Sequence, residues 1–80
     1  MIVIHTKRFE IGIHDEDKGM PHRHGWFEHN DYGDEYGGGL WFKDGVLVDY
    51  DGIADYLPAE ILDTLEGQGF NVDEMRPDKD

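Results

Sequence analysis

The segment Leu40-Trp41-Phe42-Lys43-Asp44-Gly45-Val46-Leu47-Val48 carries the clearest structural signal in this 80-residue sequence. Two apolar runs, residues 40–42 and 46–48, flank an Asp-Gly step. Asp-Gly between β-forming residues is a strong signal of a tight hairpin turn, because both turn positions take a positive φ. We therefore predict an antiparallel hairpin over residues 40–48.

The residues that precede the hairpin predict strands and a loop. Residues 2–5 are β-forming, and residues 9–13 alternate apolar and polar side chains, which is typical of a half-buried strand. These segments form one bent strand or two, because Lys7-Arg8 is not a turn signal. Residues 15–39 are rich in Gly, Asp, His and Asn, so we expect a long irregular loop anchored by Trp26 and Phe27.

After the hairpin, residues 57–60 (Leu-Pro-Ala-Glu) open a helix. Proline suits the first helical turn and a glutamate there complements the helix dipole. Gly67 or Gly69 ends the helix, and residues 70–72 return as a short edge strand. The predicted fold class is α+β, a three- to four-stranded antiparallel sheet with one helix packed across it. One domain covers residues 1–72, and residues 73–80 form a charged, frayed tail.

The charge of the chain is large and uneven. Nineteen Asp and Glu against seven Lys and Arg give a net charge of −12. Residues 1–27 hold four acids and four bases, whereas residues 28–66 hold eleven acids and one base. A polyanion is repelled by nucleic acid and by anionic membranes, so we expect neither as a direct partner.

The composition excludes several kinds of chemistry. The chain has no cysteine and no serine, which excludes disulfides, thiolate catalysis and Ser-His-Asp catalysis. No apolar run reaches the ~18 residues of a membrane span, and the first residues lack a signal-peptide pattern. Gly37-Gly38-Gly39 is not followed by the Lys-Ser/Thr of a phosphate loop. We expect a cytoplasmic, non-enzymatic protein without a cofactor.

Two groups of residues have the spacing of metal ligands. Asp49, Asp51, Asp55 and Glu60 have calcium-loop spacing, but the positions that need an oxygen ligand and a glycine hold Ile53 and Ala54. A second possibility is a zinc or nickel site, because imidazoles two residues apart on an extended segment share a face. Its ligands would be the following: His22, His24 and His29, with Asp31 as a carboxylate.

Carboxylates interleaved with aromatic residues form the last pattern. Tyrosine and tryptophan supply rigid area to interfaces, and two aspartates of one strand, such as Asp49 and Asp51, lie about 6.6 Å apart on one face. Acids at i,i+3 spacing on the predicted helix (Glu60, Asp63, Glu66) are similarly close. Such separations are comparable with phosphate spacing in nucleic acid. The candidate partner-binding residues are Trp26, Glu28, Asp31, Tyr32, Asp34, Glu35, Tyr36, Asp49, Asp51 and Asp55.

Part of the sequence, and the chain as a whole, resemble known classes of protein. Residues 38–52 (Gly-Gly-Leu-Trp-Phe-Lys-Asp-Gly-Val-Leu-Val-Asp-Tyr-Asp-Gly), followed by Leu57-Pro58-x-Glu60-Ile61, look like a segment of short uncharacterised phage-encoded proteins, over residues 37–72. In size, acidity, lack of cysteine and α+β make-up the whole chain resembles anti-CRISPR inhibitors of type I systems. That class shares no binding signature, so the resemblance assigns no role to any residue. It implies a stoichiometric inhibitor of the basic DNA- or PAM-reading surface of an effector complex.

The leading hypothesis is therefore a phage or mobile-element inhibitor that binds a host nucleic-acid-binding complex, such as a type I CRISPR effector, in the bacterial cytoplasm. Nucleic-acid mimicry is one mechanism. Two alternatives stay open: a small His/Asp metal-binding protein, and a structural accessory protein of a virion or larger complex.

Overall fold

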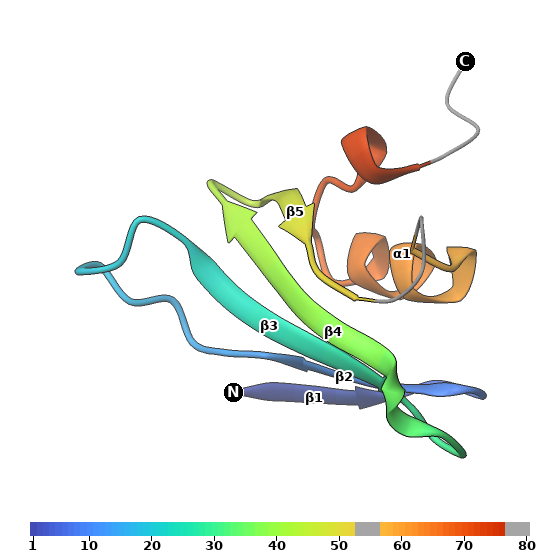
Figure 1. Ribbon diagram of the computed structural model, residues 1–80. Coiled ribbons are helices and arrows are strands. Elements are labelled where there is room, and N and C mark those ends of the chain that lie inside the picture. Colours follow the sequence, from blue (N-terminus) through green and yellow to red (C-terminus); the bar gives the residue numbers. More distant parts are fainter. Residues whose placement is uncertain (53–56, 77–80) are drawn as a thin grey trace.

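Five strands and one helix follow each other along the chain in a computed structural model, which describes residues 1–52 and 57–76, the side chain of Asp34 excepted. The elements are β1 (Ile2–His5), β2 (Phe9–Ile13), β3 (Arg23–His29), β4 (Gly33–Lys43), β5 (Val46–Tyr50), α1 (Ala59–Gly67) and the 3-10 turn η1 (Asp73–Met75). The strands form one antiparallel sheet in the order β1-β2-β3-β4-β5. Figure 1 shows α1 and η1 on the same side of the β1–β3 layer. No helix among the described residues is long and apolar enough to cross a membrane.

The α+β class, the antiparallel sheet and the single helix are confirmed, but the sheet has five strands rather than three or four. The difference comes from residues 15–39, where the predicted loop is wrong. This segment contains all of β3 and residues 33–39 of β4, and only its residues 15–22 and 30–32 lie outside strands. Trp26 and Phe27, predicted as loop anchors, are strand residues.

Glycines in β4 explain why this strand is hidden in the sequence. A Cβ atom on Gly37 would lie 2.4 Å from the Phe27 carbonyl oxygen, and one on Gly38 would lie 1.6 Å from the Asp51 carbonyl oxygen. The glycines therefore mark close backbone approaches within the sheet, which is one reason a strand contains glycine. A register irregularity between Phe27 and His29 lies opposite this segment.

The predicted hairpin is confirmed. β4 ends at Lys43 and β5 begins at Val46, so the turn is Asp44-Gly45. Both residues have positive φ, 53° and 80°. This is the backbone that a two-residue hairpin turn requires.

The core lies on one face of the sheet and under the helix. Phe9, Ile11 and Ile13 of β2 are at most 5% exposed. They belong to one cluster with nine further buried residues: Phe27, Leu40, Phe42, Leu47, Leu57, Ile61, Leu62, Leu65 and Val72. Four of these residues are apolar and have helical spacing, Leu57 just before α1 and Ile61, Leu62 and Leu65 within it. Each buried side chain of this size contributes about 1.5–3 kcal/mol relative to an exposed one.

The helix ends as the glycines predict. α1 ends at Gly67, and Gly69 takes a φ of 97°, a conformation that glycine adopts without strain. The predicted edge strand at residues 70–72 is reduced to a single parallel bridge between Asn71 and Val46. Of the predicted tail, Asp73–Met75 form η1 and Arg76 contacts Asp63 and Glu66 of α1, at 3.0 and 3.5 Å. Residues 77–80 lie outside the described residues.

Candidate functional site

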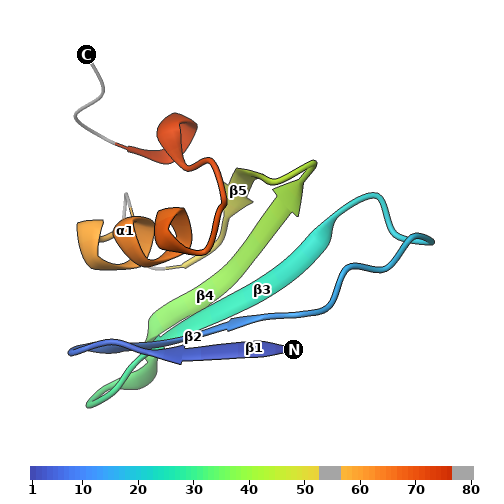
Figure 2. The ribbon, with the colours of Figure 1, turned by 180° about the vertical axis from the view of Figure 1, so that it is seen from behind.

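The face of the sheet opposite the core carries part of the predicted site, and we call it the open face. Neighbours along a strand point to opposite faces, and residues paired across strands share one. The register therefore places one set of side chains opposite the core. Figure 2 shows that α1 and η1 both lie on the other side of the sheet. The open face consists of Val3, His5, Glu10, His24, Trp26, Glu28, Trp41, Lys43, Val46 and Asp49.

Two tryptophans form the apolar centre of the open face. Trp26 pairs with Gly39, and its indole lies against Gly12, where a Cβ would be 2.2 Å from the ring atom Cε2. The Trp41 indole lies against Gly39, where a Cβ would be 2.9 Å from Cη2. Both tryptophans are half-buried. The absence of side chains on Gly12 and Gly39 lets the two indoles lie close to the backbone.

Two glutamates stand directly opposite each other beside Trp26. Glu10 of β2 pairs with Glu28 of β3 in the sheet register. Like charges in this position repel, because directly opposed Cβ atoms are only about 4.5–5.5 Å apart. His5 Nε2 lies 3.6 Å from Glu10 Oε2, so a protonated His5 would offset part of this charge.

Aromatic rings gather at the turn between β3 and β4. The rings of Tyr32 and Tyr36 have centroids 5.2 Å apart, and the His29 ring lies 4.9 Å from Tyr32. His29 also contacts Phe9, its partner in the sheet register, so this cluster lies on the core face. Tyr32 and Tyr36 are nevertheless 58% and 51% exposed. We call His29, Tyr32 and Tyr36 the tip cluster.

The predicted partner-binding residues thus divide between two surfaces. Trp26, Glu28 and Asp49 belong to the open face. Asp31 and Glu35 are exposed beside the tip cluster, which contains Tyr32 and Tyr36. Asp51 is exposed just after β5, and its N–H donates to the Gly39 carbonyl oxygen at 2.9 Å. Asp55 and the side chain of Asp34 lie outside what the structure describes. The expected array of acids is therefore not one continuous face in the described residues.

The acidic side chains of α1 form ion pairs with arginines. Arg76 pairs with Asp63 and Glu66. Glu60 accepts hydrogen bonds from the Thr6 hydroxyl, from the Arg8 Nε at 2.8 Å and from the Arg8 backbone N–H at 2.9 Å. These bonds, the Thr6 one first, lower the pKa of Glu60 to about 2. The idea that the helix acids form a phosphate-like row is therefore not supported, because each of them pairs within the chain.

The histidines of the metal hypothesis do not converge. His22 and His24 line an open hollow of about 320 Å³ together with His14, Asp15, Asp17 and Met20. His29 is five residues further along and lies in the tip cluster on the core face, whereas His24 lies on the open face. Among the described residues no group of three or more His, Asp or Glu is placed to hold a metal ion.

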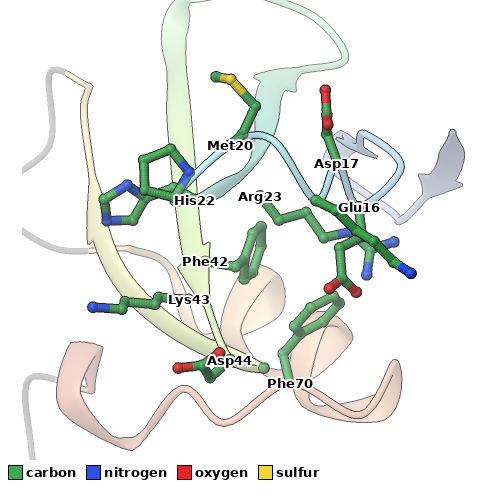
Figure 3. Close-up of a pocket in the computed structure, with 12 residues that line it drawn as sticks. Glu16, Asp17, Met20, His22, Arg23, Phe42, Lys43, Asp44 and Phe70 are labelled. Carbon is green, nitrogen blue, oxygen red and sulfur yellow. The ribbon is translucent and has the colours of Figure 1, made fainter.

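A larger cleft of about 460 Å³ lies between residues 16–23, the β4–β5 turn and Phe70. In Figure 3 Arg23 extends over Phe42 and Phe70, and its guanidinium carbon is 5.5 Å from the Phe70 ring centre. The Arg23 Nε donates to the His14 carbonyl oxygen at 2.7 Å. Three bases and three acids line the cleft, so it favours no ligand charge: Lys18, Arg23, Lys43, Glu16, Asp17 and Asp44.

Sequence reasoning missed Glu10, His24 and Trp41 as members of the open face. Two signals could have found them. Residues 24–28 alternate, with His24, Trp26 and Glu28 on one side of an extended chain. Trp41 lies on the opposite side of its strand from the buried Leu40 and Phe42. The first alternation is hard to recognise, because the composition of residues 15–39 indicates a loop.

Comparison with known proteins gives no relative: no family model, no curated protein and no solved structure matches this chain.

Proposed function

We propose that this chain is a non-enzymatic binding protein, an inhibitor of the anti-CRISPR type, which occupies the basic nucleic-acid-binding surface of a host complex. The observation that carries the proposal is that several predicted partner-binding acids form no ion pair with a basic side chain. Within residues 1–52 and 57–76, no ion pair involves any predicted partner-binding acid whose side chain is described. These acids are Glu28, Asp31, Glu35, Asp49 and Asp51.

The distribution of arginines supports the same proposal. Arg8 and Arg76 pair with acids of α1, and Arg23 lies over Phe70 at the cleft. None of these three arginines forms an ion pair with an acid of the open face or with Asp31 or Glu35 beside the tip cluster. A folded chain with a net charge of −12 gives up stability to self-repulsion. A basic partner would reverse that cost on binding and would also speed association.

Exposed aromatic rings supply the second element of a binding surface. The rings of Tyr32 and Tyr36 contact each other edge to face beside the β3–β4 turn, with more than half of each residue exposed. Rigid aromatic side chains are enriched among the residues that dominate binding energy. We therefore propose that the unpaired acids accelerate association with a basic partner. The aromatic contacts would then slow dissociation of the complex.

Inhibition of DNA binding tests the proposal. Purified type I effector complexes of several subtypes are mixed with labelled target DNA, and the bound DNA is measured as the protein is added. We expect one effector to lose DNA binding at near-stoichiometric protein. No effect on any effector would overturn the anti-CRISPR assignment.

Charge reversal tests the mechanism. D31K/E35K changes two unpaired acids beside the tip cluster, and D73K/E74K makes the same charge change on η1 as a control. We expect the first variant to lose inhibition at low salt and the control to keep it. Equal inhibition by two folded variants would remove the electrostatic mechanism.

A further inference from the structure

Both tryptophans of the chain lie on the open face. Each is half-buried, and no element among the described residues covers this side of the sheet. The indoles of Trp26 and Trp41 occupy neighbouring places, because Trp26 pairs with Gly39 and the Trp41 ring lies against Gly39. An apolar strip rimmed by polar residues is typical of an interaction surface.

The two glutamates beside this strip favour a positively charged ligand group. Glu10 and Glu28 stand opposite each other, and neither pairs with a Lys or Arg within residues 1–52 and 57–76. The other end of the strip carries one charge of each sign, because Asp49 is opposite Trp41 and Lys43 lies two residues beyond Trp41 on the same face. A cation that binds between the two glutamates removes the repulsion of a like-charge cross-strand pair.

Arginine fits this combination better than the alternatives. A guanidinium stacks on an indole face, and its fork of N–H donors can serve two carboxylates, whereas an ammonium is a compact and strongly hydrated charge. Nucleic acid is repelled by the same glutamates. In a symmetric contact a second copy would bring its own Glu10 and Glu28 into the same acidic surface.

We propose that the open face binds an arginine side chain of a protein partner, with the guanidinium on the strip formed by Trp26 and Trp41 and within reach of Glu10 and Glu28. This inference rests on the proposed function and names the group that the basic partner presents.

Tryptophan fluorescence of the full chain reports this face directly, because the chain has no other tryptophan. The probes are an oligoarginine and an oligolysine peptide of equal length and charge. We expect oligoarginine to change the emission and to bind about tenfold more tightly than oligolysine. Equal affinities, or binding without a change in emission, would overturn the inference.

Variants locate the contact. E10Q/E28Q should bind oligoarginine about tenfold more weakly, whereas D73N/E74Q, which removes the same charge from η1, should bind like the parent chain. Equal weakening of both variants would show general attraction to a polyanion and would overturn the inference. Self-association that depends on concentration and is abolished by W41A would show that the open face binds a second copy of the chain. That result would also overturn the inference.

The effector assay separates this inference from the proposed function. Inhibition kept by E10Q/E28Q and lost by D31K/E35K would leave the proposed function standing and overturn the role of the open face. Arginine-selective binding at the open face together with no effect on any effector would overturn the anti-CRISPR assignment and leave the arginine site standing.

Discussion

Glu60 is hydrogen-bonded to Arg8 through both its carboxylate oxygens, although the two residues are 52 positions apart in the sequence. Glu60 lies in the first turn of α1, and Arg8 lies in the turn between β1 and β2. The carboxylate accepts the Arg8 backbone N–H as well as the guanidinium, and the Thr6 hydroxyl also donates to it. The helix therefore holds the β1–β2 turn in place.

This contact predicts a stability effect. Glu60→Ala removes the acceptor of the Arg8 N–H and the Arg8 Nε and one of the two acceptors of the Thr6 hydroxyl, so we expect a loss of about 1–2 kcal/mol in the free energy of unfolding, measured with urea. Glu66→Ala is the control, because the Glu66 side chain is exposed and, among the described residues, its one ion pair is with Arg76 at 3.5 Å. We expect a change within about 0.5 kcal/mol for the control. Equal losses would show that the Glu60 contact is an ordinary surface pair.

The same carboxylate predicts a pH dependence. The pKa of Glu60 falls from 4.5 to about 2 on folding, so its stabilising effect is fully present above pH 4.5 and is lost as the pH falls from 4.5 toward 2. As the pH falls, the other acids are also protonated and their mutual repulsion weakens. This effect is the same in the parent chain and in Glu60→Gln, so it cancels in the comparison. The difference between their melting temperatures should therefore shrink over this window. A constant difference would contradict the assignment.

The packing of Trp26 on Gly12 predicts that a methyl group is not tolerated there. Gly12→Ala places Cβ about 2.2 Å from the indole, so the ring must move, and we expect a loss of about 1–3 kcal/mol in stability with a shift in tryptophan emission. Gly67→Ala, at the end of α1 with open space around it, should instead stabilise the fold by about 0.5 kcal/mol. A Gly12→Ala chain with unchanged stability and emission would show that Trp26 does not rest on Gly12.

The opposed glutamates predict a gain of stability when one charge is removed. Glu28→Gln leaves Glu10 opposite a neutral side chain, and we expect the free energy of unfolding to rise by about 0.2–1 kcal/mol at low salt. The gain should fade as salt screens the pair. Thermal unfolding at two salt concentrations measures it. A loss of stability at low salt would mean that Glu28 contributes to the fold rather than to binding.

Local signals in the sequence were enough for much of the fold. Asp44-Gly45 defined the hairpin, because the turn conformation depends on those two residues and their apolar neighbours. Leu57-Pro58-Ala59-Glu60 located the start of the helix, because proline and glutamate suit the first helical turn. Alternation over residues 9–13 identified a strand. Together these local patterns predicted the α+β class.

The rest depended on residues distant in sequence. Composition alone indicates a loop for β3 and the glycine-rich half of β4. They are strands because neighbouring backbone approaches Gly25, Gly37 and Gly38 closely and the Trp41 indole packs on Gly39. The two strands at residues 2–13 are separated by a turn that Glu60 stabilises from the helix. The candidate site was fixed in the same way: the sequence determined that the chain is acidic, with aromatic residues among its acids. Only the tertiary structure decided that the acids of α1 pair with Arg8 and Arg76 while Glu28 and Asp49 of the open face and Asp31 and Glu35 beside the tip cluster form no ion pair among the described residues. Pairing depends on which side chains the fold brings within a few ångströms of a base.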